Sequence, residues 1–134
     1  MIKKLEQIAK EMTLLYVDDS YELCTTYTDF FRDIFREVDC ASDGYEALQA
    51  FRRRDYDLVI TDINMPRMNG FSLIREIQKV KPQQPLIVVS AYSEIAYLSK
   101  INTCHVDYFL VKPVDTAEMI EKIYDCLERM KVHG

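Results

Sequence analysis

The sequence has no long apolar run, no excess of basic residues and few histidines. Its apolar runs reach four residues at most, whereas a membrane-spanning helix needs roughly 20, so we expect neither a membrane span nor a secretory signal. Acidic residues outnumber basic ones by 22 to 17, and the net charge is -5. General affinity for nucleic acid depends on Lys and Arg at the phosphates. The composition therefore predicts a cytoplasmic protein that contacts no membrane and no nucleic acid directly.

The cysteines and histidines form no metal-binding pattern, because no C-x-x-C pair is present and only two histidines are available. A chain of 134 residues that is 49% hydrophobic can bury a core without disulfides. Two disulfides are the alternative. We expect free thiols in a reducing cytoplasm at Cys24, Cys40, Cys104 and Cys126.

Short apolar runs alternate with stretches of helical period. The runs predict strands buried on both faces, at residues 14–17, 58–61, 86–89 and 108–111, with a weaker fifth at 38–41. Apolar side chains at helical spacing predict helices at residues 21–35, 44–53, 71–80, 93–101 and 116–130. This alternation predicts one α/β domain, in which helices cover both faces of a five-stranded parallel sheet joined by right-handed crossovers.

The first residues lie outside this alternation. Ile2, Leu5, Ile8 and Met12 share one helical stripe, which predicts an extra helix packed on the domain. We therefore divide the chain into an N-terminal helical extension at 1–11 and a single domain at 12–131.

Polar side chains follow four of the runs, where the predicted strands end. Asp18 and Asp19 follow the first run, Asp62 follows 58–61, and Ser90 and Lys112 follow the last two runs. Ligands of open parallel sheets bind at the carboxyl ends of the strands. Each residue alone could cap a helix or form a turn. Because all four positions coincide at one edge, we expect a functional site there.

The predicted site suits phosphoryl chemistry. Three carboxylates in close contact repel one another and recruit a cation, and Mg²⁺ with oxygen ligands is the cation we expect. A carboxylate can also attack phosphorus to form an acyl phosphate. Asp62 is the predicted nucleophile because it stands alone on the middle strand, which leaves the pair Asp18 and Asp19 for the metal. Lys112 and Ser90 would then contact the phosphate oxygens.

Four motifs together resemble the receiver domain of bacterial two-component response regulators. They are "LLYVDDS", "DINMPRMNG", "VVSAY" and "FLVKP", and their order and spacing match this family over about residues 12–130. The resemblance, which is to members like the chemotaxis regulator, implies the flavodoxin-like strand order 2-1-3-4-5. That order is taken from the family and not from the hydrophobic pattern.

The resemblance also implies roles for the site residues. Asp62 would accept a phosphoryl group from a phosphohistidine on a sensor histidine kinase or phosphotransfer protein. Mg²⁺ would be held by Asp19 and Asp62 directly, by the backbone carbonyl of Asn64, and by Asp18 largely through water. The implied function is a phosphorylation-activated switch that catalyses only its own phosphorylation and dephosphorylation.

The switch itself is implied by family behaviour. The hydroxyl of Ser90 would shift toward the phosphate, and an aromatic side chain on the last strand would turn inward. Counting back three residues from Lys112 places that aromatic at Phe109. The movement would alter the face made by the family's fourth helix, fifth strand and fifth helix, for a downstream protein, a linked output domain or a homodimer. The family also implies a cis bond before Pro113.

Some positions depart from the family pattern. His105 stands where family members commonly carry a small residue. Asn64 and Tyr92 would flank the phosphate, and a bulky Tyr92 would shield it from water. The sequence leaves open whether the chain is a complete single-domain regulator or part of a longer protein.

An alternative function is a Mg²⁺-dependent phosphohydrolase of the haloacid dehalogenase type, which also uses an aspartate nucleophile at a strand end. That family places a second acid two residues later, where this chain has Asn64. A flavodoxin-like cofactor binder is also disfavoured, because the carboxylates of Asp18 and Asp19 would repel the phosphate of FMN. The switch is therefore the function that the sequence favours.

Overall fold

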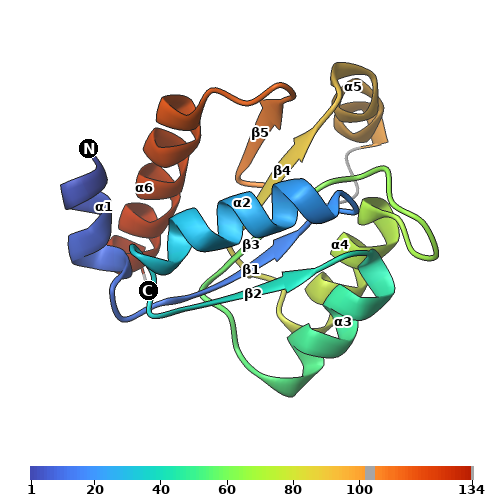
Figure 1. The fold of residues 1–134 in the computed structure, drawn as a ribbon. Coiled ribbons are helices and arrows are strands. Elements are labelled where there is room, and N and C mark those ends of the chain that lie inside the picture. The colour runs from blue at the N-terminus through green and yellow to red at the C-terminus, as the bar shows by residue number, and fades with distance from the viewer. Residues whose placement is uncertain (102–104, 134) are drawn as a thin grey trace.

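Strands and helices alternate along the chain, and the strands form one parallel sheet. The computed structural model describes residues 1–101 and 105–133 (Figure 1). The strand order is β2-β1-β3-β4-β5, so the predicted fold class and strand order are confirmed. The elements in chain order are α1 (Ile2–Ala9), β1 (Thr13–Val17), α2 (Tyr21–Arg32), β2 (Glu37–Ala41), α3 (Gly44–Arg53), β3 (Leu58–Thr61), α4 (Gly70–Val80), β4 (Leu86–Ser90), α5 (Tyr92–Ile101), β5 (Tyr108–Val111) and α6 (Thr116–His133).

The sheet is covered by helices on both faces. Every residue of β1, β3 and β4 is buried, whereas the edge strands β2 and β5 are buried only in part. Leu14 of β1 belongs to the cluster that contains the buried side chains of α1, α2 and α6. Leu15 belongs to the cluster that contains those of α3, α4 and α5. Successive strand residues point to opposite faces of the sheet. Because helices cover both faces, neither side of the central strands is exposed to water.

Polar side chains start three of the helices at one edge of the sheet. Ser20, Asp43 and Asn69 accept hydrogen bonds from the backbone N–H groups of Leu23, Glu46 and Ser72 at 3.2, 2.8 and 3.0 Å. A side-chain oxygen that satisfies a free N–H of the first turn stabilises a helix start. These caps fix where the loops after β1, β2 and β3 end.

Helix α2 ends earlier than the periodicity predicts. The backbone N–H groups of Ile34 and Phe35 both donate to the carbonyl of Phe31, at 2.9 and 2.8 Å. This turn brings Ile34 and Phe35 into the core, where both are buried. Apolar side chains in a buried turn resemble a continued helix in the sequence, so the predicted end at residue 35 was wrong.

The N-terminal helix α1 packs beside α6 (Figure 1). Leu5 and Ala9 are fully buried, and Ile8 and Met12 are buried in part. Ile2, which the predicted stripe included, is exposed. The division of the chain after residue 11 stays a prediction.

The expectation of four free thiols is corrected by the structure. Cys24 on α2 and Cys40 on β2 are joined by a disulfide, with Cα atoms 6.2 Å apart, a separation that a disulfide can span. The sequence did not reveal this pair because its proximity depends on how α2 packs on β2. Cys126 is a buried free thiol, whose pKa burial raises to about 12. Cys104 lies outside the described residues.

Within residues 1–101 and 105–133, none of the helices has the length and apolar composition that a membrane crossing requires.

Candidate functional site

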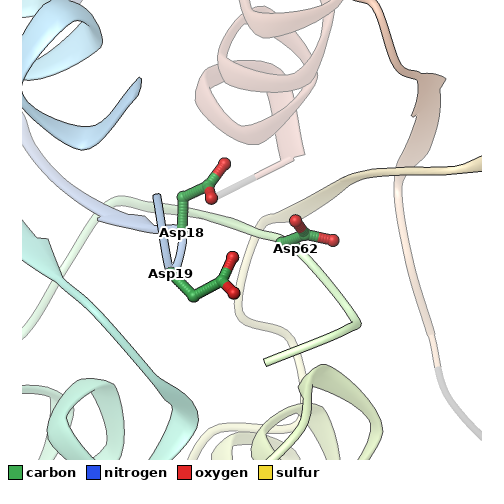
Figure 2. Close-up of side chains that lie close together, drawn as sticks. All are labelled: Asp18, Asp19 and Asp62. Atoms are coloured by element: carbon green, nitrogen blue, oxygen red, sulfur yellow. The ribbon is translucent and has the colours of Figure 1, made fainter. Parts of the chain in front are cut away.

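Three carboxylates meet where β1 and β3 end. Val17 pairs with Thr61 in the sheet, so Asp18 and Asp62, the residues that follow them, leave neighbouring strands side by side. One carboxylate oxygen from each of Asp18, Asp19 and Asp62 lies within 4.8 Å of the others (Figure 2). Asp18 and Asp62 are buried, with 2% and 6% of their surface exposed. Buried charges at this spacing need a positive partner.

Lys112 and Ser90 supply contacts from the next two strands. Ser90 and Val111 are paired between β4 and β5, which places Lys112 beside Ser90. The ammonium of Lys112 donates to Oδ2 of Asp62 at 2.7 Å and to Oδ2 of Asp18 at 3.1 Å. The Ser90 hydroxyl donates to Oδ1 of Asp62 at 2.7 Å. The structure thus brings together the carboxylates, the hydroxyl and the ammonium that the strand ends predicted.

The side chain of Asp62 is held at both oxygens. Its Oδ1 also accepts the backbone N–H of Ile63 at 2.6 Å, and its Oδ2 accepts only Lys112 among the described contacts. A carboxylate with fixed orientation does not have to be ordered before it reacts. Asp62 is therefore better placed as a nucleophile than Asp18, which lies farther from Lys112 and accepts the N–H of Ser20 at 2.9 Å.

The charges of the cluster are not balanced. Three carboxylates and one ammonium leave two uncompensated negative charges. Burial lowers the pKa of Lys112, but its hydrogen bonds to Asp62 and Asp18 outweigh burial and raise that pKa above its usual value. Burial and the neighbouring charges of Asp18 and Asp62 raise the pKa of Asp19. Carboxylate oxygens in this arrangement fit a divalent cation such as Mg²⁺.

We expect Asp19→Asn to stabilise the metal-free protein at pH 7. The raised pKa of Asp19 means that the folded state binds its proton more tightly than the unfolded state, so stability falls as the pH rises through the folded pKa. Because Asp19 is exposed, the gain should be below about 1 kcal/mol. Thermal unfolding of both proteins, with and without MgCl₂, measures the effect.

Added Mg²⁺ should reverse the order of stability of the parent and Asp19→Asn. MgCl₂ should stabilise the parent more than Asp19→Asn, because the variant has one carboxylate fewer in the cluster. Asp33→Asn, an exposed change at the far end of α2, serves as the matched control. A metal-free Asp19→Asn protein that is less stable than its parent would contradict the repulsion described above.

The residues predicted to switch lie on β4 and β5. Ser90 is 1% exposed. Phe109 is half-buried against the cluster under α3, α4 and α5, whereas Tyr108 packs against the opposite cluster. The peptide bond between Lys112 and Pro113 is cis.

Two of the remaining predicted positions follow the carboxyl ends of strands, whereas His105 precedes β5 at the opposite edge of the sheet. Tyr92, the first residue of α5, and Asn64, in the loop after β3, are exposed. His105 is also exposed, and its Nε2 lies 3.1 Å from Oδ1 of Asp107. The shielding role of Tyr92 and the metal contact of the Asn64 carbonyl stay predictions.

Sequence reasoning missed one pair next to the cluster. Asp43, before α3, accepts a hydrogen bond from Arg67, in the loop after β3, at 2.6 Å. The two residues lie within segments that have turn and cap signals, "SDG" and "MPRMNG", which gave no indication that they touch.

Known proteins share both the sequence and the fold. Residues 14–124 match the family model for the response regulator receiver domain. The transcriptional regulatory protein GlrR of Escherichia coli K12 is 36% identical over 120 residues, which cover 90% of this chain and 27% of GlrR. ZraR of Escherichia coli O157:H7 is 31% identical over 90% of this chain and 26% of its own length. The chain thus spans about a quarter of the length of these relatives.

Solved structures agree with the sequence matches. A response regulator receiver domain protein from Clostridium thermocellum superposes with a TM-score of 0.82 at 25% identity, covering 92% of this chain and 99% of the other. A chain of the CheX-CheY-BeF₃-Mg²⁺ complex from Borrelia burgdorferi gives a TM-score of 0.76 at 27% identity, covering 85% of this chain and 87% of the other.

Proposed function

The chain belongs to the response regulator receiver domain family, and from this premise we propose that it is a signalling switch in which Asp62 accepts a phosphoryl group. The donor is a phosphohistidine on a sensor histidine kinase or phosphotransfer protein in the cytoplasm. One oxygen of Asp62 attacks phosphorus while the phosphorus–nitrogen bond breaks, and the histidine leaves as imidazole after taking a proton. The observation that carries the proposal is a buried aspartate held by Lys112 and Ser90 next to two further carboxylates.

Mg²⁺ is the cofactor that the residues of the site fit. Asp18, Asp19, Asp62 and the backbone carbonyl of Asn64 would hold it, which gives the oxygen-only ligands that this ion prefers. When bound, it neutralises charge on the phosphoryl oxygens during transfer. The similar chain from Borrelia burgdorferi belongs to a complex with Mg²⁺ and BeF₃, which supports the assignment.

The side chains that hold Asp62 also connect phosphorylation to a change of shape. An acyl phosphate adds about two negative charges at the end of β3. Lys112 and Ser90, which contact Asp62 before the reaction, would turn to the new phosphate oxygens. A modification shifts an equilibrium only by its different interactions with the two states. Movement of Ser90 toward the phosphate would allow the half-buried Phe109 to turn inward.

The output of this switch is a change in partner binding. The extra helix α1 shifts the numbering, so the family's output face corresponds to α5, β5 and α6 in this chain. This face would contact a downstream protein, a covalently linked output domain or a second copy of the chain. GlrR and ZraR are named transcriptional regulators, which supports an output domain as one such partner.

Acetyl phosphate provides a direct test. The protein is incubated with acetyl phosphate and MgCl₂, and intact mass spectrometry is expected to show one added phosphoryl group per chain. EDTA in place of MgCl₂ should prevent the addition. Catalytic release of phosphate from a range of phosphate monoesters, without a stable adduct, would support the phosphohydrolase instead.

We expect Lys112→Ala to slow phosphorylation by roughly 100-fold, as for the loss of one preorganised donor to the charge that develops in a transition state. The ammonium of Lys112 contacts the same carboxylates that would bind the cation, so its removal should strengthen Mg²⁺ binding. The defect should therefore persist at saturating Mg²⁺.

Initial rates of labelling measure this effect across a range of MgCl₂ concentrations. Lys79→Ala removes an exposed lysine near the far end of α4, paired with Glu76, and should leave the rate unchanged. If excess Mg²⁺ restored the rate of Lys112→Ala, Lys112 would serve only to assist metal binding.

A further inference from the structure

The loop between β3 and α4, residues 62–69, is attached to the start of α3. The Asp43 carboxylate caps α3 through Oδ1, which accepts the backbone N–H of Glu46 at 2.8 Å. Its Oδ2 accepts Nε of Arg67 in the loop at 2.6 Å. Asp43 is only 5% exposed, so its charge needs these partners. Burial favours a higher pKa for Asp43, but Arg67 and the Glu46 N–H outweigh burial and hold the pKa below its usual value.

Arg67 takes an unusual backbone conformation to make this contact. Its φ is 65°, and no other residue in the described part of the chain, glycine included, has a positive φ. Residues other than glycine rarely adopt a positive φ, so the surrounding contacts must hold Arg67 in this conformation. Its guanidinium also lies 5.1 Å from the ring centroid of Tyr45, on the first turn of α3.

A backbone contact adds to the attachment. The N–H of Gly44 donates to the carbonyl of Met68 at 2.9 Å. A Cβ at Gly44 would lie 2.3 Å from that carbonyl oxygen, so only glycine permits the approach. The loop therefore meets the start of α3 through an ion pair, a ring contact and a backbone hydrogen bond.

The attached segment contains the proposed metal ligand. Asn64 is exposed, but its neighbours Ile63 and Met65 are buried, with 2% and 7% of their surface exposed. The N–H of Gly70 donates to the carbonyl of Ile63 at 2.8 Å and closes the loop. A cap on α3 alone would not require Arg67 to contact Asp43, whereas a loop that must present one carbonyl in a fixed direction needs anchors on both sides.

We propose that Asp43 and Arg67 are positioning residues that hold the β3–α4 loop so that the backbone carbonyl of Asn64 faces the cation. This role rests on the proposed function of the site. Neither side chain would touch the cation. The pair would act as a support for the ligand, as residues behind a metal ligand commonly do.

Two variants separate this role from the helix cap. Asp43→Asn keeps a side chain that caps helices well but removes the charge that binds Arg67. Arg67→Ala removes the guanidinium and leaves Asp43 in place. For both variants of the full chain we expect the dissociation constant for Mg²⁺, from calorimetric titration, to rise about tenfold. The rate of acetyl phosphate labelling at saturating Mg²⁺ should stay within about twofold of the parent.

The controls test whether the two residues act as one unit. The double variant should bind Mg²⁺ no more weakly than either single variant, because both changes break the same contact. Glu37→Gln removes an ion pair of equal length with Arg54, at 2.6 Å, where β2 begins, and should not change Mg²⁺ affinity. Thermal unfolding should show that all variants are folded at the assay temperature.

The possible results distinguish failure of the positioning role from failure of the proposed function. Parental Mg²⁺ affinity in folded Asp43→Asn and Arg67→Ala, with the parent phosphorylated normally, would overturn the positioning role alone. A loss of labelling at saturating Mg²⁺ would also overturn it, since the pair would then act on the reaction itself. A parent that binds no Mg²⁺ and takes up no phosphoryl group would overturn the proposed function as well.

Discussion

Asp62→Asn is expected to fold and to take up no detectable phosphoryl group. The side-chain carbonyl of asparagine can still accept the hydrogen bonds that Ser90 and the Ile63 N–H make to Oδ1. An amide nitrogen would replace Oδ2, which now accepts the ammonium of Lys112. That nitrogen is a hydrogen-bond donor and not a nucleophile toward phosphorus, so the loss should be complete and not partial.

Intact mass after incubation with acetyl phosphate and MgCl₂ measures this loss. Asp55→Asn changes an exposed aspartate between α3 and β3, at the opposite edge of the sheet, and should be labelled like the parent. Circular dichroism should show the same fold in both variants. One phosphoryl group on Asp62→Asn would show that another residue is the acceptor. That result would remove the main support for the proposed switch.

The second large effect is expected from Gly70→Ala. Alanine favours a helix by about 1 kcal/mol relative to glycine, and Gly70 is the first residue of α4, so propensity alone predicts stabilisation. A Cβ at this position would, however, lie 2.3 Å from the carbonyl oxygen of Asp62 and 2.7 Å from Cα of Ile63. Both are backbone atoms and cannot move aside as a flexible side chain would.

The clash should outweigh the propensity. Forcing atoms into a packed site costs about 3 kcal/mol at the upper end of the usual range, so we expect a net loss of roughly 2 kcal/mol in the free energy of unfolding. Displacement of the Asp62 backbone should also reduce phosphorylation. Urea unfolding measures the loss, and Ser72→Ala, an exposed position in the same helix, should change stability little. A gain in stability for Gly70→Ala would show that the loop can yield.

The convergence of the site residues could be predicted from the sequence for a simple geometric reason. Parallel strands end at one edge of a sheet, so residues that follow each apolar run, such as Asp62, Ser90 and Lys112, must gather there whatever the details of packing. The order of the strands came from the family resemblance and not from periodicity. Helix starts could also be predicted from the sequence, because side chains such as Ser20 cap them through local contacts.

Features that depend on packing between elements could not be predicted from the sequence. The disulfide of Cys24 and Cys40 requires α2 to lie on β2 in one register. The contact of Asp43 with Arg67 requires two loops that are far apart in the sequence to meet. The end of α2 was missed because a buried turn and a helix both require apolar side chains. In each case the deciding partner lies on a different element from the residue being interpreted.

The position of α1 bears on how fragments of this protein should be cut. The family match begins at residue 14, yet Leu5 and Ala9 of α1 are fully buried in the cluster that includes Leu127 of α6. A fragment trimmed to the family boundary would expose hydrophobic surface along α6, and exposed hydrophobic surfaces tend to associate in water. Dimers formed by that shortened version should therefore be ascribed to the missing helix before they are taken as a sign of signalling.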